Sequence, residues 1–111
     1  MELSALTDDE TLVLVGFMRV VARADGQFTE EEEQHVAIVE RVLGPERFRQ
    51  ATLDARAKLG DLDALKAAAK EVTRQDARVM IYKVLTNLAA SDEITREEEK
   101  PLRWLASWWR L

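Results

Sequence analysis

Two acidic loops carry the residues of this sequence whose types and spacing could do chemistry. In the first, Asp25 precedes Gly26 and is followed by Glu32, and in the second Asp92 is followed by Glu98. Carboxylates without nitrogen or sulfur partners favour hard cations, so these four acids predict a metal site for calcium, magnesium or manganese. Each loop supplies few carboxylates, so either the two loops converge or water completes the coordination shell. We therefore expect weak binding.

Other interpretations of the first loop are available. Asp25 and Glu32 fall at positions 5 and 12 of an EF-hand, but positions 1 and 3 would be Val21 and Arg23, which offer no side-chain oxygen. An EF-hand is therefore excluded. Acids in the first turn of a helix also interact favourably with its dipole, by about 0.3–1 kcal/mol each. A role limited to helix capping stays open beside the metal site.

The single histidine, His35, offers little for catalysis. It follows Glu32 by three residues, which is the spacing of di-iron bundles, but those sites need two such motifs. We interpret His35 as an exposed helix residue. A hydrolase would need His35 beside Ser4, Ser91 or Ser107 and a carboxylate, and no nucleophile elbow or glycine-rich phosphate loop supports this. We expect no enzyme, no catalytic residue and no cofactor other than a divalent cation.

The elements that must position the acids are helices. The 111 residues include only four Gly and two Pro, and the composition is typical of helices. Capping boxes, in which Thr is followed three residues later by Glu, begin at Thr7, Thr29 and Thr95. Asp61 is a further expected N-cap. Gly44 should end the helix that begins at Thr29. We expect an all-α fold, a small orthogonal bundle without strands, with helices over about 8–24, 29–43, 45–59, 61–72, 74–91 and 95–109.

Apolar spacing assigns a buried face to each helix. The first should be central, because Leu14, Phe17 and Met18 form one stripe while Val13 and Val15 indicate burial on other sides. Later helices should also bury the apolar residues Val42, Leu53 and Leu62. The basic residues of the third helix are expected to form a solvated face: Arg47, Arg49, Arg56 and Lys58.

The first and last hairpins look like two copies of one unit, over about 8–43 and 74–109, with connecting helices over about 45–72. We expect them to superpose by a rotation near twofold, with Val21 contacting Leu88. The second copy is one residue shorter beyond its aspartate. The matched positions are Leu14, Phe17, Met18, Val21, Ala22 and Asp25 over Ile81, Val84, Leu85, Leu88, Ala89 and Asp92.

The segment from Val21 to Glu32, VARADGQFTEEE, resembles the signature of the TerB-like (tellurite-resistance protein TerB) family, and the segment from Ala90 to Glu98 resembles its second copy. The resemblance covers about residues 8–106, although the second loop lacks the glycine. It implies a single TerB-like helical domain over 1–111 and an acidic cluster that binds divalent metal. It also implies association with bacterial stress-response systems at or near the membrane, through partners.

Composition narrows the class of function. A net charge of −5 would repel a phosphate backbone, so we expect no nucleic-acid binding. The absence of Cys excludes disulfides and thiolate sites. The longest apolar stretch, 12–22, is too short to span a bilayer and no signal peptide is visible, so we expect a cytoplasmic protein. The predicted function is a non-enzymatic module that binds a partner protein, with a metal-independent scaffold as the alternative; the oligomeric state stays open.

The last helix contains two further features. Pro101 is the sixth residue after Thr95, so the helix should kink there or begin there. Trp104, Trp108 and Trp109 follow on one stripe. If Trp104 packs into the core while Trp108 or Trp109 stays largely exposed, the exposed ring predicts a binding patch.

Overall fold

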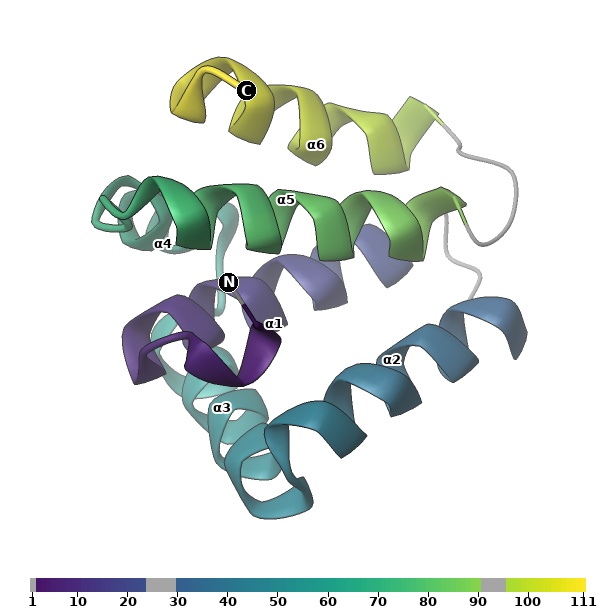
Figure 1. Cartoon of the computed structure of the whole chain (residues 1–111). Coiled ribbons are helices and arrows are strands. Elements are labelled where there is room, and N and C mark those ends of the chain that lie inside the picture. The colour runs from purple at the N-terminus through teal and green to yellow at the C-terminus, as the bar shows by residue number, and fades with distance from the viewer. Residues whose placement is uncertain (1, 24–29, 91–95) are drawn as a thin grey trace.

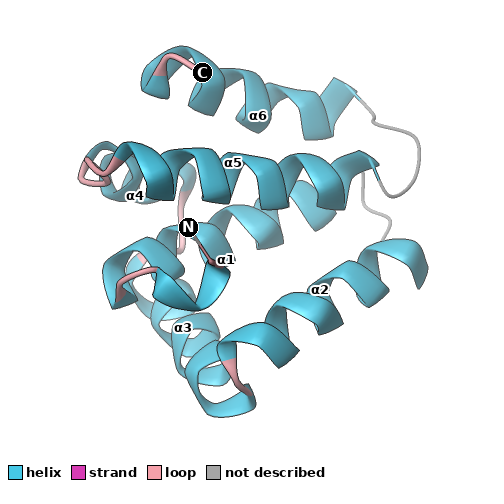
Figure 2. Ribbon diagram, in the orientation of Figure 1, coloured by secondary structure: helices cyan, strands magenta, loops and turns pink. Residues whose placement is uncertain are grey.

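The computed structural model describes residues 2–23, 30–90 and 96–111. Every regular element in these ranges is a helix and none is a strand, which confirms the all-α prediction (Figure 2). No helix in these ranges is long and apolar enough to cross a membrane. A 3-10 helix, η1 (Leu3–Ala5), precedes α1 (Asp8–Arg23), α2 (Glu30–Leu43), α3 (Pro45–Lys58), α4 (Leu62–Lys70), α5 (Gln75–Ala90) and α6 (Arg96–Trp109).

Helix α1 is the centre of the fold, as its apolar residues predict. It packs against α3, α4, α5 and α6 (Figure 1), whereas α2 packs against α3, α5 and η1. Leu14 and Phe17 are fully buried in the main core, while Val15 turns to a second cluster with Ala51 and Ala55 of α3. Burial on more than one side therefore makes α1 the element on which the others are positioned.

Two predicted helix starts are confirmed by their hydrogen bonds. The amide of Glu10 donates to Thr7 Oγ1 at 3.2 Å, and the amide of Thr7 donates to Glu10 Oε1 at 2.8 Å, which completes a capping box. The amide of Ala64 donates to Asp61 Oδ1 at 2.7 Å and caps α4. Gly44, with φ 97°, separates α2 from α3 in a conformation that favours glycine. The other two boxes involve Thr29 and Thr95, which lie outside the described residues.

The last helix begins at Arg96 and continues through Pro101. The alternative in which it begins at Pro101 is therefore wrong. Pro101 is the sixth of the fourteen residues of the helix, so it lies in the helix interior and removes one intrahelical hydrogen bond there.

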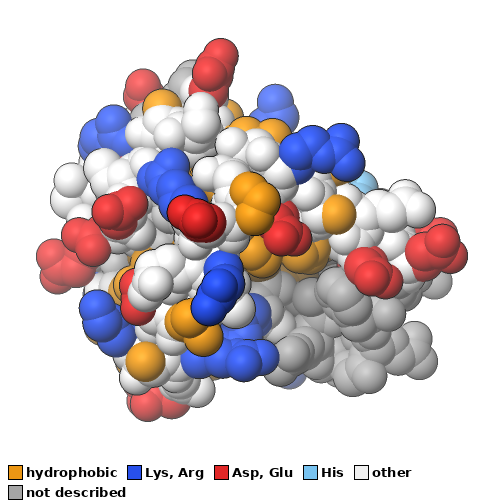
Figure 3. All heavy atoms as spheres, turned by 90° about the horizontal axis from the view of Figure 1, so that it is seen from below, with side chains coloured by type: hydrophobic (Ala, Val, Ile, Leu, Met, Phe, Trp, Pro, Cys, Tyr) orange, Lys and Arg blue, Asp and Glu red, His pale blue; other side chains and the backbone are white. Residues whose placement is uncertain are grey.

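Three apolar residues expected in buried faces are about half exposed: Val42, Leu53 and Leu62. Val42 precedes the buried Leu43 by one residue, which turns it about 100° away from the buried stripe of α2. Leu53 likewise lies between the buried Ala51 and Ala55. Figure 3 shows orange side chains surfacing among interspersed acidic and basic ones on the lower face of the molecule.

Candidate functional site

Glu32 is the one predicted metal ligand whose side chain the structure describes. It lies in the first turn of α2 and is only 2% exposed, whereas Glu30, Glu31 and Glu33 in the same turn are exposed. Its burial follows from helical register, because Glu32 precedes the buried Val39 and Leu43 by seven and eleven residues on one stripe. Glu32 also takes part in an interaction inside the structure. A carboxylate is thus held at the start of α2.

The other predicted ligands cannot be placed beside it. Asp25 and Asp92 lie outside the described residues, and the same is true of the side chain of Glu98, although α6 includes that position. Among the side chains that are described, no group of three or more His, Asp or Glu could hold a metal ion. The structure therefore describes the side chain of one of the four predicted ligands.

A second buried glutamate shows how this fold holds such a group. Glu10, 5% exposed in the first turn of α1, receives hydrogen bonds from Arg74 just before α5: Nε donates to Oε2 at 2.9 Å and Nη2 to Oε1 at 2.5 Å. These hydrogen bonds from Arg74 are the main reason that the pKa of Glu10 lies below its ordinary value, and the capping bond with Thr7 adds to the effect. Glu10 is therefore a structural anion that joins α1 to the segment just before α5.

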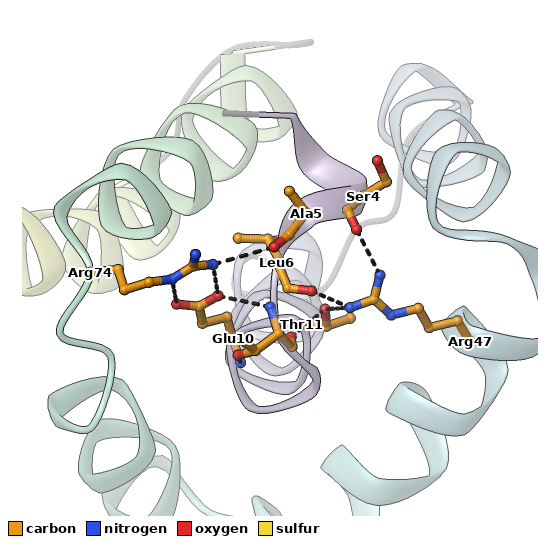
Figure 4. A network of polar contacts seen from close by, with 8 residues as sticks. Ser4, Ala5, Leu6, Glu10, Thr11, Arg47 and Arg74 are labelled. Atoms are coloured by element: carbon orange, nitrogen blue, oxygen red, sulfur yellow. Dashed lines mark hydrogen bonds and ion pairs between the residues drawn. The ribbon is translucent and has the colours of Figure 1, made fainter.

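Arg47 of α3 binds the N-terminal segment from the other side of Glu10 (Figure 4). Its Nη1 donates to the carbonyl of Ser4 at 3.1 Å, and its Nη2 donates to the carbonyl of Leu6 and to Thr11 Oγ1. Arg47 was expected on a solvated face, and that expectation is wrong. Its partners lie about 40 residues away in the sequence, so local spacing carries no signal for them.

The C-terminal tryptophans separate into core and surface. Trp109 is fully buried, and its Nε1–H donates to the carbonyl of Ala69 at 3.1 Å. Trp104 is half-buried and stacks on the buried Phe17 with ring centroids 6.3 Å apart. Trp108 stacks on the outer side of Trp104 at 6.0 Å and is 46% exposed. The core ring is therefore Trp109 rather than the expected Trp104, which only packs against the core, and Trp108 is the exposed ring.

His35 was expected to be exposed, but it is half-buried. It lies three residues after Glu32 and four before Val39, at the edge of the buried stripe of α2. The ring lines a small pocket of about 130 Å³ together with Leu3, Met18, Ile38, Val39, Val84, Asn87 and Leu88. None of these described lining residues is a carboxylate, a serine or a threonine.

Comparison of this chain with protein-family models, with curated proteins and with solved structures finds no match.

Proposed function

We propose that this chain is a non-enzymatic helical interaction module of the TerB-like, stress-response type, in which a divalent cation binds at the acidic loops. The proposed ligands are Asp25 and Glu32 in the first copy and Asp92 and Glu98 in the second. Calcium, magnesium or manganese would suit an all-oxygen donor set. The proposed setting is the cytoplasm, with a partner protein as the binding target and contact with membranes only through partners.

The observation that carries the proposal is the burial of Glu32. Removing a carboxylate from water costs several kcal/mol unless charge and hydrogen bonds compensate. Glu32 directly follows the first acidic loop, and its side chain is held within the fold while its three neighbouring glutamates face solvent. A fixed carboxylate loses little further freedom when it binds an ion, which suits it to be a ligand.

Helix lengths support the proposed duplication. The first helix of each copy, α1 or α5, has 16 residues, and the second, α2 or α6, has 14. The first helix begins at residue 8 in the first copy and at 75 in the second, and the second helix begins at 30 and at 96. Each shift equals the sequence offset between the two copies at that point. In sequence, Glu98 precedes Leu102 and Leu105 by the intervals that separate Glu32 from Val36 and Val39. A second, equivalent ligand position at Glu98 is therefore part of the proposal.

A thermal-shift experiment tests the proposal. An ion that binds only the folded protein with a Kd of about 0.5 mM would, at about 10 mM, stabilise it by about 1.8 kcal/mol. For a domain of this size, that free energy corresponds to a rise of roughly 5–10 °C in the melting temperature. We expect this rise with at least one of calcium, magnesium and manganese.

Two variants locate the effect. Glu32→Gln keeps an oxygen that can serve in a capping box but loses the anionic ligand, so the rise should disappear. Glu31→Gln removes the same charge from the exposed neighbour in the same turn and should keep the rise. Equal melting shifts in both variants, or none in the wild type with any of the ions, would contradict the cation site.

The second candidate function is a metal-independent protein-binding scaffold in which the acids are only helix caps. The structure of Glu10 favours it, because that buried glutamate, also at the third position of its helix, is held by Thr7 and Arg74. On this alternative Glu32→Gln would leave the response to ions unchanged, and only protein partners would bind the module.

A further inference from the structure

The face formed by α4 and the C-terminal half of α6 combines exposed apolar side chains with positive charge. Leu62 on α4 and Trp108 on α6 are each 46% exposed. Lys66 Nζ lies over the ring of Trp104 at 5.1 Å, and Lys70 Nζ lies over the ring of Trp108 at 4.6 Å. Two lysines of α4 therefore cover two stacked rings of α6, at the edge of the aromatic stack that begins in the core.

Both lysines have charge available for a partner. Two ion pairs of the described ranges join Arg47 to Asp8 and Arg74 to Glu10, and neither involves α4. A cation over a ring retains N–H groups that point away from it, and these can still donate to a carboxylate. The face thus presents an aromatic surface beside ammonium groups that form no ion pair in that part of the chain.

The order of charges along α4 is self-complementary. Asp63, Ala67 and Lys70 are exposed and lie at i, i+4 and i+7, which places them on one stripe of the helix. Asp63 is in the first turn and Lys70 in the last, about 10 Å apart by helical rise. A second α4 laid antiparallel on the first brings each Asp63 opposite the other copy's Lys70. The small side chain of Ala67 permits close approach at the centre of the contact.

We propose that this face is a twofold homodimer interface, in which Asp63 of each copy pairs with Lys70 of the other and Trp108 packs near Leu62 of the other. The occupant is a second copy because the charge order and the two exposed apolar residues complement themselves, as a twofold interface requires. An anionic membrane fits less well, since the chain carries a net charge of −5 and the acidic Asp63 lies on the same helix as the two lysines. This inference goes beyond the cation site proposed above and does not depend on it.

The interface is small, so the dimer should be weak. Helix α4 has nine residues, which is about 13.5 Å of helix, and only the adjacent turns of α6 extend the contact. Such an area lies at the low end of specific interfaces, and a Kd on the order of 100 μM is expected. Sedimentation analysis should show a mass rising from 12.7 kDa towards twice that value as the concentration increases from about 10 μM to about 1 mM.

Reciprocal charge variants test the pairing. Lys70→Glu alone should weaken dimerisation at least about tenfold, because it places acids opposite Asp63 in both pairs, and Asp63→Lys alone should do the same with like positive charges. In an equal mixture of the two variants, both contacts of the heterodimer again join opposite charges. The mixture should therefore regain the wild-type Kd to within about threefold, an outcome that damage to folding would not produce.

Control variants match the helix positions of these changes. Lys58→Glu alters a lysine in the last turn of α3, and Glu46→Lys alters an acid in its first turn, so both change the helix-end electrostatics in the same sense without touching the α4 face. Both should dimerise as the wild type does. Trp108→Ala should weaken the dimer at least about tenfold while helicity, measured by circular dichroism, is retained.

Two outcomes would overturn the inference. One is a wild-type protein that stays monomeric up to about 1 mM, or a mixture of folded Lys70→Glu and Asp63→Lys proteins that does not associate. The other is a monomer that cosediments with vesicles of phosphatidylglycerol and phosphatidylcholine and loses this binding in Trp108→Ala, which would assign the face to an anionic membrane.

Discussion

Gly16 of α1 lies close against α4, and Gly16→Ala tests this contact. A Cβ atom added at Gly16 would lie 2.6 Å from Leu65 Cδ1 and 3.5 Å from Leu59 Cδ1. The first distance is too short for two carbon atoms, so Leu65 would have to move. Leu65 is fully buried, and its side chain cannot escape into solvent by changing rotamer.

Two opposing effects determine how much Gly16→Ala changes the free energy of unfolding. Replacing Gly by Ala inside a helix stabilises it by about 1 kcal/mol, whereas overpacking a filled core costs about 1–3 kcal/mol. The clash should win, and Gly16→Ala should lower the free energy of unfolding by about 1 kcal/mol. Leu65→Ala alone should cost about 2–5 kcal/mol because it leaves a cavity. In that background the clash disappears, so adding Gly16→Ala should stabilise the protein by about 1 kcal/mol.

Urea denaturation followed by far-ultraviolet circular dichroism would measure all four proteins. We expect Gly16→Ala to lower the free energy of unfolding in the wild-type background and to raise it in the Leu65→Ala background, which is a coupling of about 2 kcal/mol. A Gly16→Ala protein that is more stable than the wild type, or one with the same effect in both backgrounds, would refute the packing of α1 on α4.

Further predictions concern individual side chains. The pKa of Glu10 is lower in the folded protein than in the unfolded chain. Its contribution to stability is therefore complete above the unfolded pKa and is lost as the pH falls through the folded pKa. In Glu10→Gln, the free energy of unfolding should depend less steeply on pH in the acid range. Replacing its partner by Arg74→Met should cost about 1–2 kcal/mol at neutral pH, measured by urea denaturation. Arg110 has φ 56°, so Arg110→Gly should raise the free energy of unfolding by up to about 1 kcal/mol in the same assay. Trp109→Phe removes a buried hydrogen bond and should cost about 2 kcal/mol, whereas Trp108→Phe should change stability by less than about 0.5 kcal/mol.

The sequence predicts the helices well because their start signals are local. Thr7 and Asp61 carry their capping partners within three residues, and Gly44 before Pro45 separates α2 from α3. The central place of α1 follows from apolar residues on several of its sides. Long-range contacts have no such signal, which is why Arg47 was assigned to solvent although it holds the segment before α1.

The candidate site was predictable only in part, for the same physical reason. The residue types in the acidic loops indicate a cation, but helical register is what distinguishes Glu32 from its neighbours. That register was available in the spacing from Glu32 to Val39 and Leu43, and it predicts burial on the same stripe. The aromatic stack illustrates the opposite case, because the two lysines that cover Trp104 and Trp108 come from a different helix.

The most direct test of the proposed function is a calorimetric titration of the wild type, Glu32→Gln and Glu31→Gln with calcium, magnesium and manganese. We expect binding heat with at least one ion at millimolar concentration for the wild type and for Glu31→Gln. For Glu32→Gln we expect an affinity at least about tenfold lower, because one of few anionic ligands is lost. Absence of binding heat in the wild type with every ion, or equal affinity in Glu32→Gln, would contradict the cation site and leave Glu32 as a structural residue.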